Sequence, residues 1–262
     1  MKKLTAILLS ILMVLSMVSA ASADSLSDIK EKGQLIVGAS VAFPPYEFYD
    51  DATGEPTGID IEIAHLIATN LGYELVVEDI DFDAIIPGVA SGKYDLSMAG
   101  MTVTEERQQS VNFSESYATG VQVVIVKEDS DLTLEKLFEG GYKIGVQMGT
   151  TGDLYTTWDL EDYGLATIER FKSGADAVLA LTAGKVDCVV IDNEPAKNFV
   201  AANEGLKILE TEYIQEQYAA CFSKENTALL EAFNTELKKL IEDGSVQAII
   251  DKFIPPVAEE AA

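Results

Sequence analysis

Hydrophobic residues change their spacing repeatedly along this chain, and each change marks a new structural element. Short apolar runs such as "LIVGA", residues 35–39, predict buried strands. Longer segments such as 59–71 place apolar side chains every three to four positions and predict helices, with Gly72 as a C-terminal stop. The regular alternation of the two patterns predicts an α/β fold with helices packed on largely parallel sheets.

The remaining elements follow from the same patterns. Strands are expected at residues 73–78, 95–99, 121–126, 143–147, 187–191, 206–210 and 218–223. Helices are expected at residues 83–90, 104–110, 134–138, 175–182, 194–202, 227–243 and 245–253.

One unit occurs twice, as "IIPGVASGKYDLSMAG" and "AVLALTAGKVDCVVID". Both copies pass from a helix through Gly-Lys and one further residue to an aspartate, Asp95 or Asp187, and then into an apolar strand. This repetition indicates two similarly built lobes with a cleft between them. In open α/β sheets, ligands bind beyond the carboxyl ends of the strands.

The N-terminus has the pattern of a secretory signal peptide. Lys2 and Lys3 precede an apolar stretch over residues 4–18 and the small residues "SAASA", which predicts cleavage after residue 23. A membrane anchor is the alternative, but a spanning helix needs about 20 apolar residues. No cysteine stands directly after the apolar stretch, at the expected cleavage site, so a lipid anchor is not indicated. We therefore expect export to the periplasm or the extracellular surface.

Charge and cysteine content narrow the range of partners. The net charge is −26, and loss of the signal peptide would make it about −28. Such a charge repels nucleic acid and anionic membranes, so neither is expected as a partner. Cys188 and Cys221 could form a disulfide after export or remain two buried thiols. Neither has a metal-ligand neighbour, and no metal or cofactor is expected.

Polar and aromatic residues gather where the predicted strands end. In chain order they are Ser40, Phe43, Gly100, Thr102, Arg107, Gln147, Thr150, Thr151 and Asp192. Arg107, one of only two arginines, can hold a carboxylate through a bidentate pair. Backbone N–H groups at the helix start near Thr150 and Thr151 favour an anion, and Asp192 can accept from an ammonium. These groups together fit an α-amino acid, with Phe43 beside its apolar part.

Each group also has a simpler interpretation when taken alone. Arg107 could form a surface ion pair with Glu105 or Glu106, and Asp192 could cap the helix that follows it. Phe43 and Tyr46 could be core aromatics. The segment "GVQMGTTG" resembles a phosphate loop but lacks the Gly-Lys-Ser/Thr ending, so nucleotide binding is not indicated. Placement of all these groups at strand ends favours a shared ligand site.

Five blocks in order resemble the extracellular solute-binding proteins of family 3, the amino-acid-binding components of ABC importers. They begin with "LIVGASVAFPPYEFYD…GEPTGIDIEIAHLIATNLGY" and "FDAIIPGVASGKYDLSMAGMTVTEERQQSVNFSESY", and continue with "KIGVQMGTTGD", "AGKVDCVVIDNEPAKNFV" and "LKKLIEDGSVQAIIDKF". The resemblance covers roughly residues 33–254. It implies a two-lobed, type II periplasmic-binding-protein-like fold.

In that fold two Rossmann-like lobes are joined by two hinge crossings and close on the ligand. The resemblance assigns residues 24–119 and 218–262 to lobe I and residues 120–217 to lobe II. It implies a protein without catalytic activity that works as a monomer and delivers its amino acid to a membrane permease.

By matching positions, the resemblance also implies a role for each site residue. Arg107, Thr102 and the backbone at Thr151 would hold the ligand carboxylate. Asp192, Thr102 and the carbonyl group of Gly100 would take the ammonium.

The other end of the ligand is expected to meet different residues. The resemblance implies that Phe43 packs on the ligand side chain and that Ser40 and Gln147 reach its polar end. Many relatives carry an acidic residue where Ser40 stands and an aromatic residue where Ile59 stands. Ser40 disfavours a basic ligand, and Ile59 would leave one pocket wall aliphatic, so a polar, uncharged amino acid is expected.

Two other functions are compatible with this family. Cyclohexadienyl dehydratases share the fold and need a general acid in the cleft. The single histidine, His65, is expected to be a partly buried structural residue, which leaves Glu47 and Asp192 as candidate proton donors. A sensing module is the third reading, although no transmembrane helix or signalling domain follows Phe253.

Overall fold

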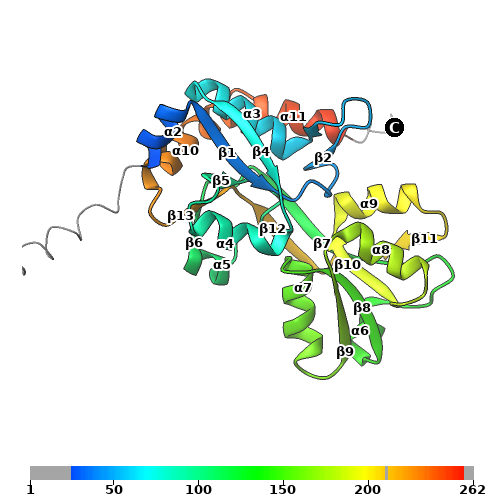
Figure 1. Cartoon of the computed structure of the whole chain (residues 1–262). Helices are drawn as coiled ribbons and strands as arrows, with labels where there is room; N and C mark the ends of the chain where they lie inside the picture. Colours follow the sequence, from blue (N-terminus) through cyan, green and yellow to red (C-terminus); the bar gives the residue numbers. More distant parts are fainter. Residues whose placement is uncertain (1–24, 210–211, 257–262) are drawn as a thin grey trace, which may run out of the picture.

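The computed structural model describes residues 25–209 and 212–256 and shows two sheets, each flanked by helices (Figure 1). The first sheet has the strand order β4-β1-β5-β13-β6, and the second has the order β11-β7-β10-β8-β9 with β12 paired to β7. A short β2-β3 pair stands apart. The predicted α/β fold with two lobes is confirmed.

The strands lie close to the apolar runs of the sequence. They are β1 (Gln34–Ala39), β2 (Phe48–Tyr49), β3 (Pro56–Thr57), β4 (Glu74–Asp79), β5 (Leu96–Ser97), β6 (Val111–Phe113), β7 (Ala118–Lys127), β8 (Tyr142–Gln147), β9 (Ala166–Phe171), β10 (Cys188–Asp192), β11 (Leu206–Ile208), β12 (Ile214–Tyr218) and β13 (Cys221–Ser223).

The helices cover both sheets. They are α2 (Ser25–Lys32), α3 (Ile59–Leu71), η1 (Phe82–Ala84), α4 (Ile85–Ala90), α5 (Glu105–Ser110), α6 (Leu134–Glu139), α7 (Thr151–Thr156), η2 (Thr157–Glu161), α8 (Gly174–Thr182), α9 (Asn193–Ala202), α10 (Thr227–Glu242) and α11 (Ser245–Phe253). The sequence pattern did not indicate α2, β2, β3, β6, β9, β12 or η2.

Helix α3 shows how the sequence sets these bounds. Ile59, Ile63 and Ile67 are buried on one face, and the helix packs against β4, α10 and α11. Gly72 ends the helix in the left-handed conformation, with its N–H bonded to the carbonyl groups of Ala68 and Thr69, as a glycine can without strain.

Both sheets are mixed, so the prediction of largely parallel sheets is wrong. In the first sheet β1 runs parallel to β4 and β5, while β13 is antiparallel to β5 and β6. In the second, β8 is parallel to β9 and β10, but β7 is antiparallel to β10, β11 and β12. The antiparallel strands are those that carry the chain between the lobes or follow such a crossing.

The two crossings lie side by side. Strand β7 leaves the first lobe at Ala118, and β12 returns to it with Tyr218 opposite Ala118. The chain then changes sheets, because β12 ends at Tyr218 and β13 begins at Cys221. The single strand predicted for residues 218–223 is therefore wrong, since this segment spans the junction between the lobes.

The repeated sequence unit has the same structural role in both lobes. Asp95 accepts a hydrogen bond from the backbone N–H of Ile36 at 2.8 Å, and Asp187 accepts one from Lys143 at 2.8 Å. The backbone N–H of Asp95 donates in return to the carbonyl group of Ile36, and that of Asp187 donates to the carbonyl group of Lys143. The aspartate thus ties the start of one strand to its neighbour, twice.

Several smaller expectations can now be compared with the structure. Cys188 and Cys221 are free, buried thiols on strands of different sheets. His65 is exposed, so its expected partial burial is wrong; the side chain lies on the outer face of α3. The predicted signal peptide, residues 1–23, lies outside the described residues. Among the described residues, no helix combines the length and apolar character that crossing a bilayer requires.

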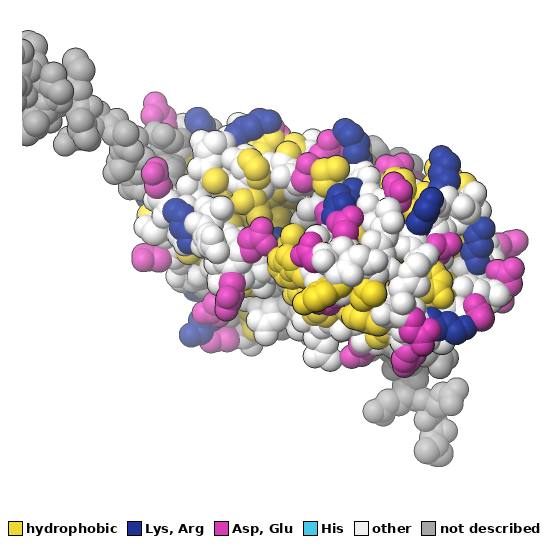
Figure 2. All heavy atoms as spheres, turned by 90° about the horizontal axis from the view of Figure 1, so that it is seen from below, with side chains coloured by type: hydrophobic (Ala, Val, Ile, Leu, Met, Phe, Trp, Pro, Cys, Tyr) yellow, Lys and Arg dark blue, Asp and Glu magenta, His cyan; other side chains and the backbone are white. Residues whose placement is uncertain are grey.

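Surface charge is spread rather than concentrated on the face seen in Figure 2. Acidic and basic side chains are distributed over both lobes, and hydrophobic side chains gather towards the middle of this face. The high net negative charge therefore does not form one acidic patch there.

Candidate functional site

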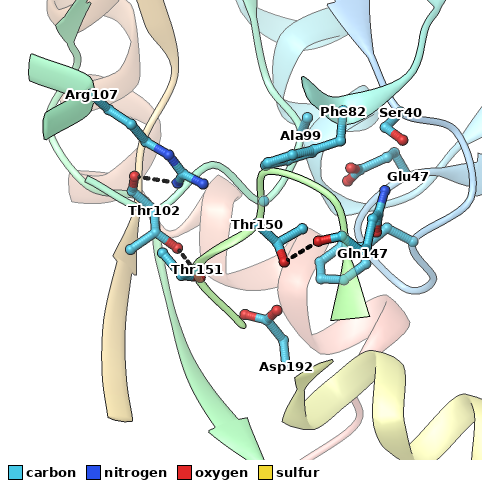
Figure 3. A pocket seen from close by; sticks show the side chains of 12 residues that line it. Ser40, Glu47, Phe82, Ala99, Thr102, Arg107, Gln147, Thr150, Thr151 and Asp192 are labelled. Atoms are coloured by element: carbon cyan, nitrogen blue, oxygen red, sulfur yellow. Dashed lines mark hydrogen bonds between the residues drawn. The ribbon is translucent and has the colours of Figure 1, made fainter. Parts of the chain in front are cut away.

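A pocket of about 300 Å³ lies between the two lobes (Figure 3). Its lining residues come from the ends of β1, β5, β8 and β10 and from the segments that follow β1, β4, β5 and β8. They are Ser40, Phe43, Glu47, Phe82, Ala99, Gly100, Thr102, Arg107, Gln147, Thr150, Thr151 and Asp192. The structure thus brings together the site residues expected from the sequence, apart from Ile59.

Ile59 lies elsewhere. It is the first residue of α3, its side chain is fully buried in the core, and it borders a separate groove with Tyr117 and Asn193. The wall expected from Ile59 is provided instead by Phe82, which precedes α4. The sequence pattern showed Phe82 only as an apolar residue before a helix.

Arg107 is buried at one end of the pocket, near the lobe junction. Its Nη1 donates to the carbonyl oxygen of Thr102 at 2.7 Å, and its Nη2 donates to that of Gly149 at 3.0 Å. The guanidinium carbon lies 5.5 Å from the centre of the Phe82 ring. Two of the five N–H donors are thereby used, one towards each lobe, and the group is oriented for a planar anion.

Burial lowers the pKa of Arg107, and the charge of Glu216 opposes this shift. The guanidinium remains a cation at neutral pH, because an arginine pKa starts above 12. The surface ion pair proposed for Arg107 is wrong: its side chain is only 5% exposed, and its hydrogen bonds go to carbonyl groups.

The turn between β8 and α7 faces Arg107 from the second lobe. The Thr150 hydroxyl donates to the carbonyl group of Gln147 at 2.8 Å and accepts from the N–H of Asp153. Asp153 in turn accepts from the N–H of Gly149 at 3.0 Å and from Nε of Arg170 at 2.8 Å. The turn is held in place, and its Thr151 is buried against the pocket.

Asp192 ends β10 and is buried in the pocket. It precedes α9, but its side chain makes no capping bond to that helix, so the simple helix-cap interpretation is wrong. The carboxylate instead accepts a short hydrogen bond from the Tyr218 hydroxyl. Burial raises the pKa of Asp192 well above its usual range, and the charge of Glu216 raises it further. A ligand ammonium would favour the ionised form.

Gly100 brings the backbone to the pocket wall. Its φ is 53°, and a Cβ atom there would lie 2.9 Å from the Phe43 ring, so only glycine fits without displacement. Its N–H donates to Asp60 at 2.7 Å, and Asp60 also accepts from the Tyr117 hydroxyl at 2.6 Å. Burial raises the pKa of Asp60 to about 7.

Glu216 is a site neighbour that the sequence analysis missed. It is buried on β12, and its Oε2 accepts from the Thr102 hydroxyl at 2.9 Å and from the Gln122 side-chain amide at 3.2 Å. A half-buried strand is recognised by apolar residues at every second position. In β12 one of the inward positions is Glu216, so the sequence pattern did not single out this residue.

The opposite end of the pocket holds Ser40, Glu47 and Gln147. Glu47 is fully buried, and neither carboxylate oxygen has a hydrogen-bond partner among the described residues. Burial raises the pKa of Glu47 well above its usual range, and the charges of Asp60 and Asp192 raise it further. The sequence analysis considered Glu47 only as a proton donor for the enzyme alternative.

The geometry has a clear chemical polarity. One end offers a fork of cationic donors, hydroxyl groups and a carboxylate within one small space, and the other end offers an unpaired carboxyl group. Such an arrangement suits a small zwitterion whose side chain extends towards Glu47.

The chain matches a known protein family over most of its length. The family described as bacterial extracellular solute-binding proteins, family 3, matches residues 35–256. The arginine-binding extracellular protein ArtP of Bacillus subtilis is 28% identical, with 97% of this chain and 98% of ArtP covered.

Solved structures extend the likeness to the fold. A P235GK mutant of ArgBP from T. maritima is 39% identical, with a TM-score of 0.81 and coverage of 87% of this chain and 98% of ArgBP. The ancestral amino-acid-binding protein AncCDT-1, a precursor of cyclohexadienyl dehydratase, is 30% identical, with a TM-score of 0.79 and coverage of 87% and 99%. With the family model matching residues 35–256, this chain belongs to the bacterial extracellular solute-binding proteins, family 3.

Proposed function

We propose that this protein binds an α-amino acid with a cationic side chain, of the arginine type, outside the cytoplasm and delivers it to a membrane permease. The observation that carries the choice of side chain is the unpaired carboxyl group of Glu47 in the pocket.

A buried carboxylate without a partner is costly, because it has lost its water and gained no compensating bond. Glu47 lies at the end of the pocket away from Arg107, where the side chain of an amino acid held by Arg107 would point. A guanidinium or ammonium group there would supply the missing donors to both oxygens. Ser40 and Gln147 would accept its remaining N–H groups.

The similarity to two arginine-binding proteins supports the same choice. The buried carboxyl group of Glu47 therefore outweighs the expectation of an uncharged ligand, which rested on Ser40 and Ile59.

A polar, uncharged amino acid of the glutamine type remains the second candidate. The raised pKa of Glu47 favours a protonated carboxyl group in the empty pocket, and this form can donate to an amide oxygen and accept from an amide N–H. Ser40 and Gln147 could complete those bonds. The two candidates thus differ in whether Glu47 is ionised in the complex.

The α-carboxylate and α-ammonium are assigned to the junction end. Arg107 and the backbone N–H groups at Thr102 and Thr151 would hold the carboxylate, and Asp192, the Thr102 hydroxyl and the Gly100 carbonyl group would hold the ammonium. Arg107 and Thr102 come from lobe I, residues 24–119 plus 218–262, and Thr151 and Asp192 from lobe II, residues 120–217. A ligand that contacts both lobes at once favours the closed state.

We further propose that the protein is exported, acts as a monomer and has no catalytic activity. The similarity to AncCDT-1 keeps the dehydratase reading relevant, since Glu47 and Asp192 have the raised pKa that a general acid needs. Incubation of the purified protein with prephenate or arogenate tests this directly: no product is expected, and turnover would overturn the non-enzymatic assignment.

A thermal-shift screen of the twenty amino acids tests the ligand class. A ligand at 100 times its dissociation constant stabilises the folded state by about 2.7 kcal/mol, enough for a clear rise in Tm. We expect the largest rise with arginine, followed by lysine. A rise with glutamine and none with arginine would replace the first candidate by the second, and no rise with any amino acid would overturn the proposed function.

A further inference from the structure

The buried side chain of Glu216 lies behind the pocket wall rather than on it. It comes from β12, the strand that returns the chain to the first lobe, and it stands opposite Gly120 of β7. Its Oε2 atom accepts two hydrogen bonds, from the Thr102 hydroxyl at 2.9 Å and from Nε2 of Gln122 at 3.2 Å. Thr102 lines the pocket, whereas Glu216 is not one of the lining residues. Glu216 can therefore affect a ligand only through another residue such as Thr102.

The bond to Glu216 fixes the direction of the Thr102 hydroxyl. A hydroxyl group has one proton to donate and two lone pairs that accept, whereas an ionised carboxylate can only accept. The Thr102 proton is therefore directed to Glu216, and the oxygen lone pairs remain for other partners. The Thr151 hydroxyl lies 3.5 Å from the Thr102 hydroxyl oxygen and can donate to one of its lone pairs, which leaves the second lone pair for a partner in the pocket.

We propose that Glu216 is a positioning residue that takes the Thr102 hydroxyl proton, turns the lone pairs of Thr102 towards the ligand, and so makes the site select an α-ammonium over an α-hydroxyl group. This inference rests on the proposed function, because it assumes that an α-amino acid occupies the pocket.

The selectivity follows from counting donors and acceptors. An ammonium has three protons and no lone pair, so Thr102, Asp192 and the Gly100 carbonyl group can each accept one of them. An α-hydroxyl group has one proton and two lone pairs. In the same place it would leave two acceptors unpaired and bring its lone pairs against theirs, a mismatch that a buried polar site rejects strongly.

Both hydrogen bonds to the Glu216 side chain end on one oxygen. Nε2 of Gln122 donates to Oε2, as the Thr102 hydroxyl does, while Oε1 has no partner among the described residues. Arg107 lies close enough for the charge of Glu216 to raise the pKa of the Arg107 guanidinium.

Two variants separate the orientation of Thr102 from the charge of Glu216. Glu216→Met removes the acceptor and keeps a long side chain, while Glu216→Gln removes the charge but keeps one oxygen that can accept from Thr102. Calorimetry would give the Kd of L-arginine and of 2-hydroxy-5-guanidinopentanoic acid, its α-hydroxy analogue. If wild type binds glutamine instead, L-glutamine and 2-hydroxyglutaramic acid replace them.

The readout is the ratio of the two dissociation constants, hydroxy acid over amino acid. We expect Glu216→Met to lower this ratio about tenfold or more and Glu216→Gln to keep it within about threefold of wild type. In a Thr102→Val background, Glu216→Met should change the ratio no further, because the hydroxyl through which it acts is gone. Glu169→Gln, which removes an exposed glutamate charge on strand β9 of the second lobe, serves as the matched control.

Melting curves identify variants that are folded, so that loss of binding through unfolding is excluded. An unchanged ratio in folded Glu216→Met overturns the proposal, as does an effect that persists in the Thr102→Val background. An equal loss in Glu216→Gln and Glu216→Met also overturns it, since charge would then be the cause. Failure of the proposed function is distinct: wild type would bind no amino acid at all.

Discussion

The two ends of the pocket differ in how their polar groups are satisfied. At the junction end, Arg107 donates to carbonyl groups of both lobes, Asp192 accepts from Tyr218, and Thr102 donates to Glu216. At the far end, both oxygens of Glu47 lack a partner among the described residues.

This difference separates affinity from selectivity. The junction end is oriented by the protein itself, so little reorganisation is needed when the constant part of an amino acid arrives. The far end is completed only by a ligand side chain of suitable charge. A protein with this layout binds amino acids as a class through one end and chooses among them through the other.

Removal of Arg107 should have the largest effect. Arg107→Ala takes away the cation placed for the α-carboxylate, and we expect a loss of about 1,000-fold, or about 4 kcal/mol, for arginine and glutamine alike. Arg107→Lys keeps the charge without the planar fork and should lose less. Calorimetry measures both variants, and unchanged affinity in Arg107→Ala would remove the carboxylate assignment.

Asp192→Asn should weaken the same end with a different signature. The amide keeps the size of the side chain but loses the charge that faces the ammonium, so we expect L-arginine to bind about 100-fold more weakly. The des-amino analogue 5-guanidinopentanoic acid lacks the ammonium and should lose far less. If both ligands weaken equally, Asp192 is not the ammonium site.

Glu47→Gln tests the far end alone. We expect arginine to lose about 30-fold, since its cation would face a neutral amide, while glutamine changes by less than about threefold. The des-amino analogues of arginine and glutamine should show the same difference between the two side chains, because they lack only the α-ammonium. A uniform loss for all ligands would show that Glu47 supports the pocket wall without reading the side chain.

Proton release should show the smallest but most specific difference. The pKa values of Glu47 and Asp192 are raised in the empty pocket, and a bound cation lowers them again, so binding expels protons and strengthens as pH rises. Arginine would ionise both groups, whereas glutamine would ionise Asp192 alone. Calorimetry in buffers of different ionisation enthalpy should find more protons released with arginine; equal release would contradict the ionic pairing at Glu47.

Much of the fold could be predicted because local pattern and final environment agree. Helix α3 and strand β1 carry clear apolar faces, and both are buried on those faces. Strand β9 escaped because, among its residues, only Ile168 is buried. Strand β12 escaped because one of its inward residues is Glu216, and a buried glutamate is invisible to a pattern of apolar positions.

The site residues could be predicted for a different reason, namely their places at the ends of strands. Arg107, Thr102 and Asp192 stand at strand ends, where topology alone brings side chains together. Glu47 lies in a loop whose path depends on tertiary packing, so its position in the pocket could not be read from spacing. Ile59 shows the converse: it matches a family position, yet its side chain faces the core.

The paired crossings have a consequence for how the chain acquires its structure. Strand β13 lies between β5 and β6 in the first sheet, although residues 114–220 separate it from β6 in sequence. Closing so long a loop as a free coil costs conformational entropy. In the finished protein, Ala118 and Tyr218 are paired neighbours, so a second lobe that has already formed delivers β13 to its place. The topology therefore favours one order of assembly. The inserted lobe is a continuous segment that can fold first, and the discontinuous lobe is then completed around the two ends of the inserted lobe.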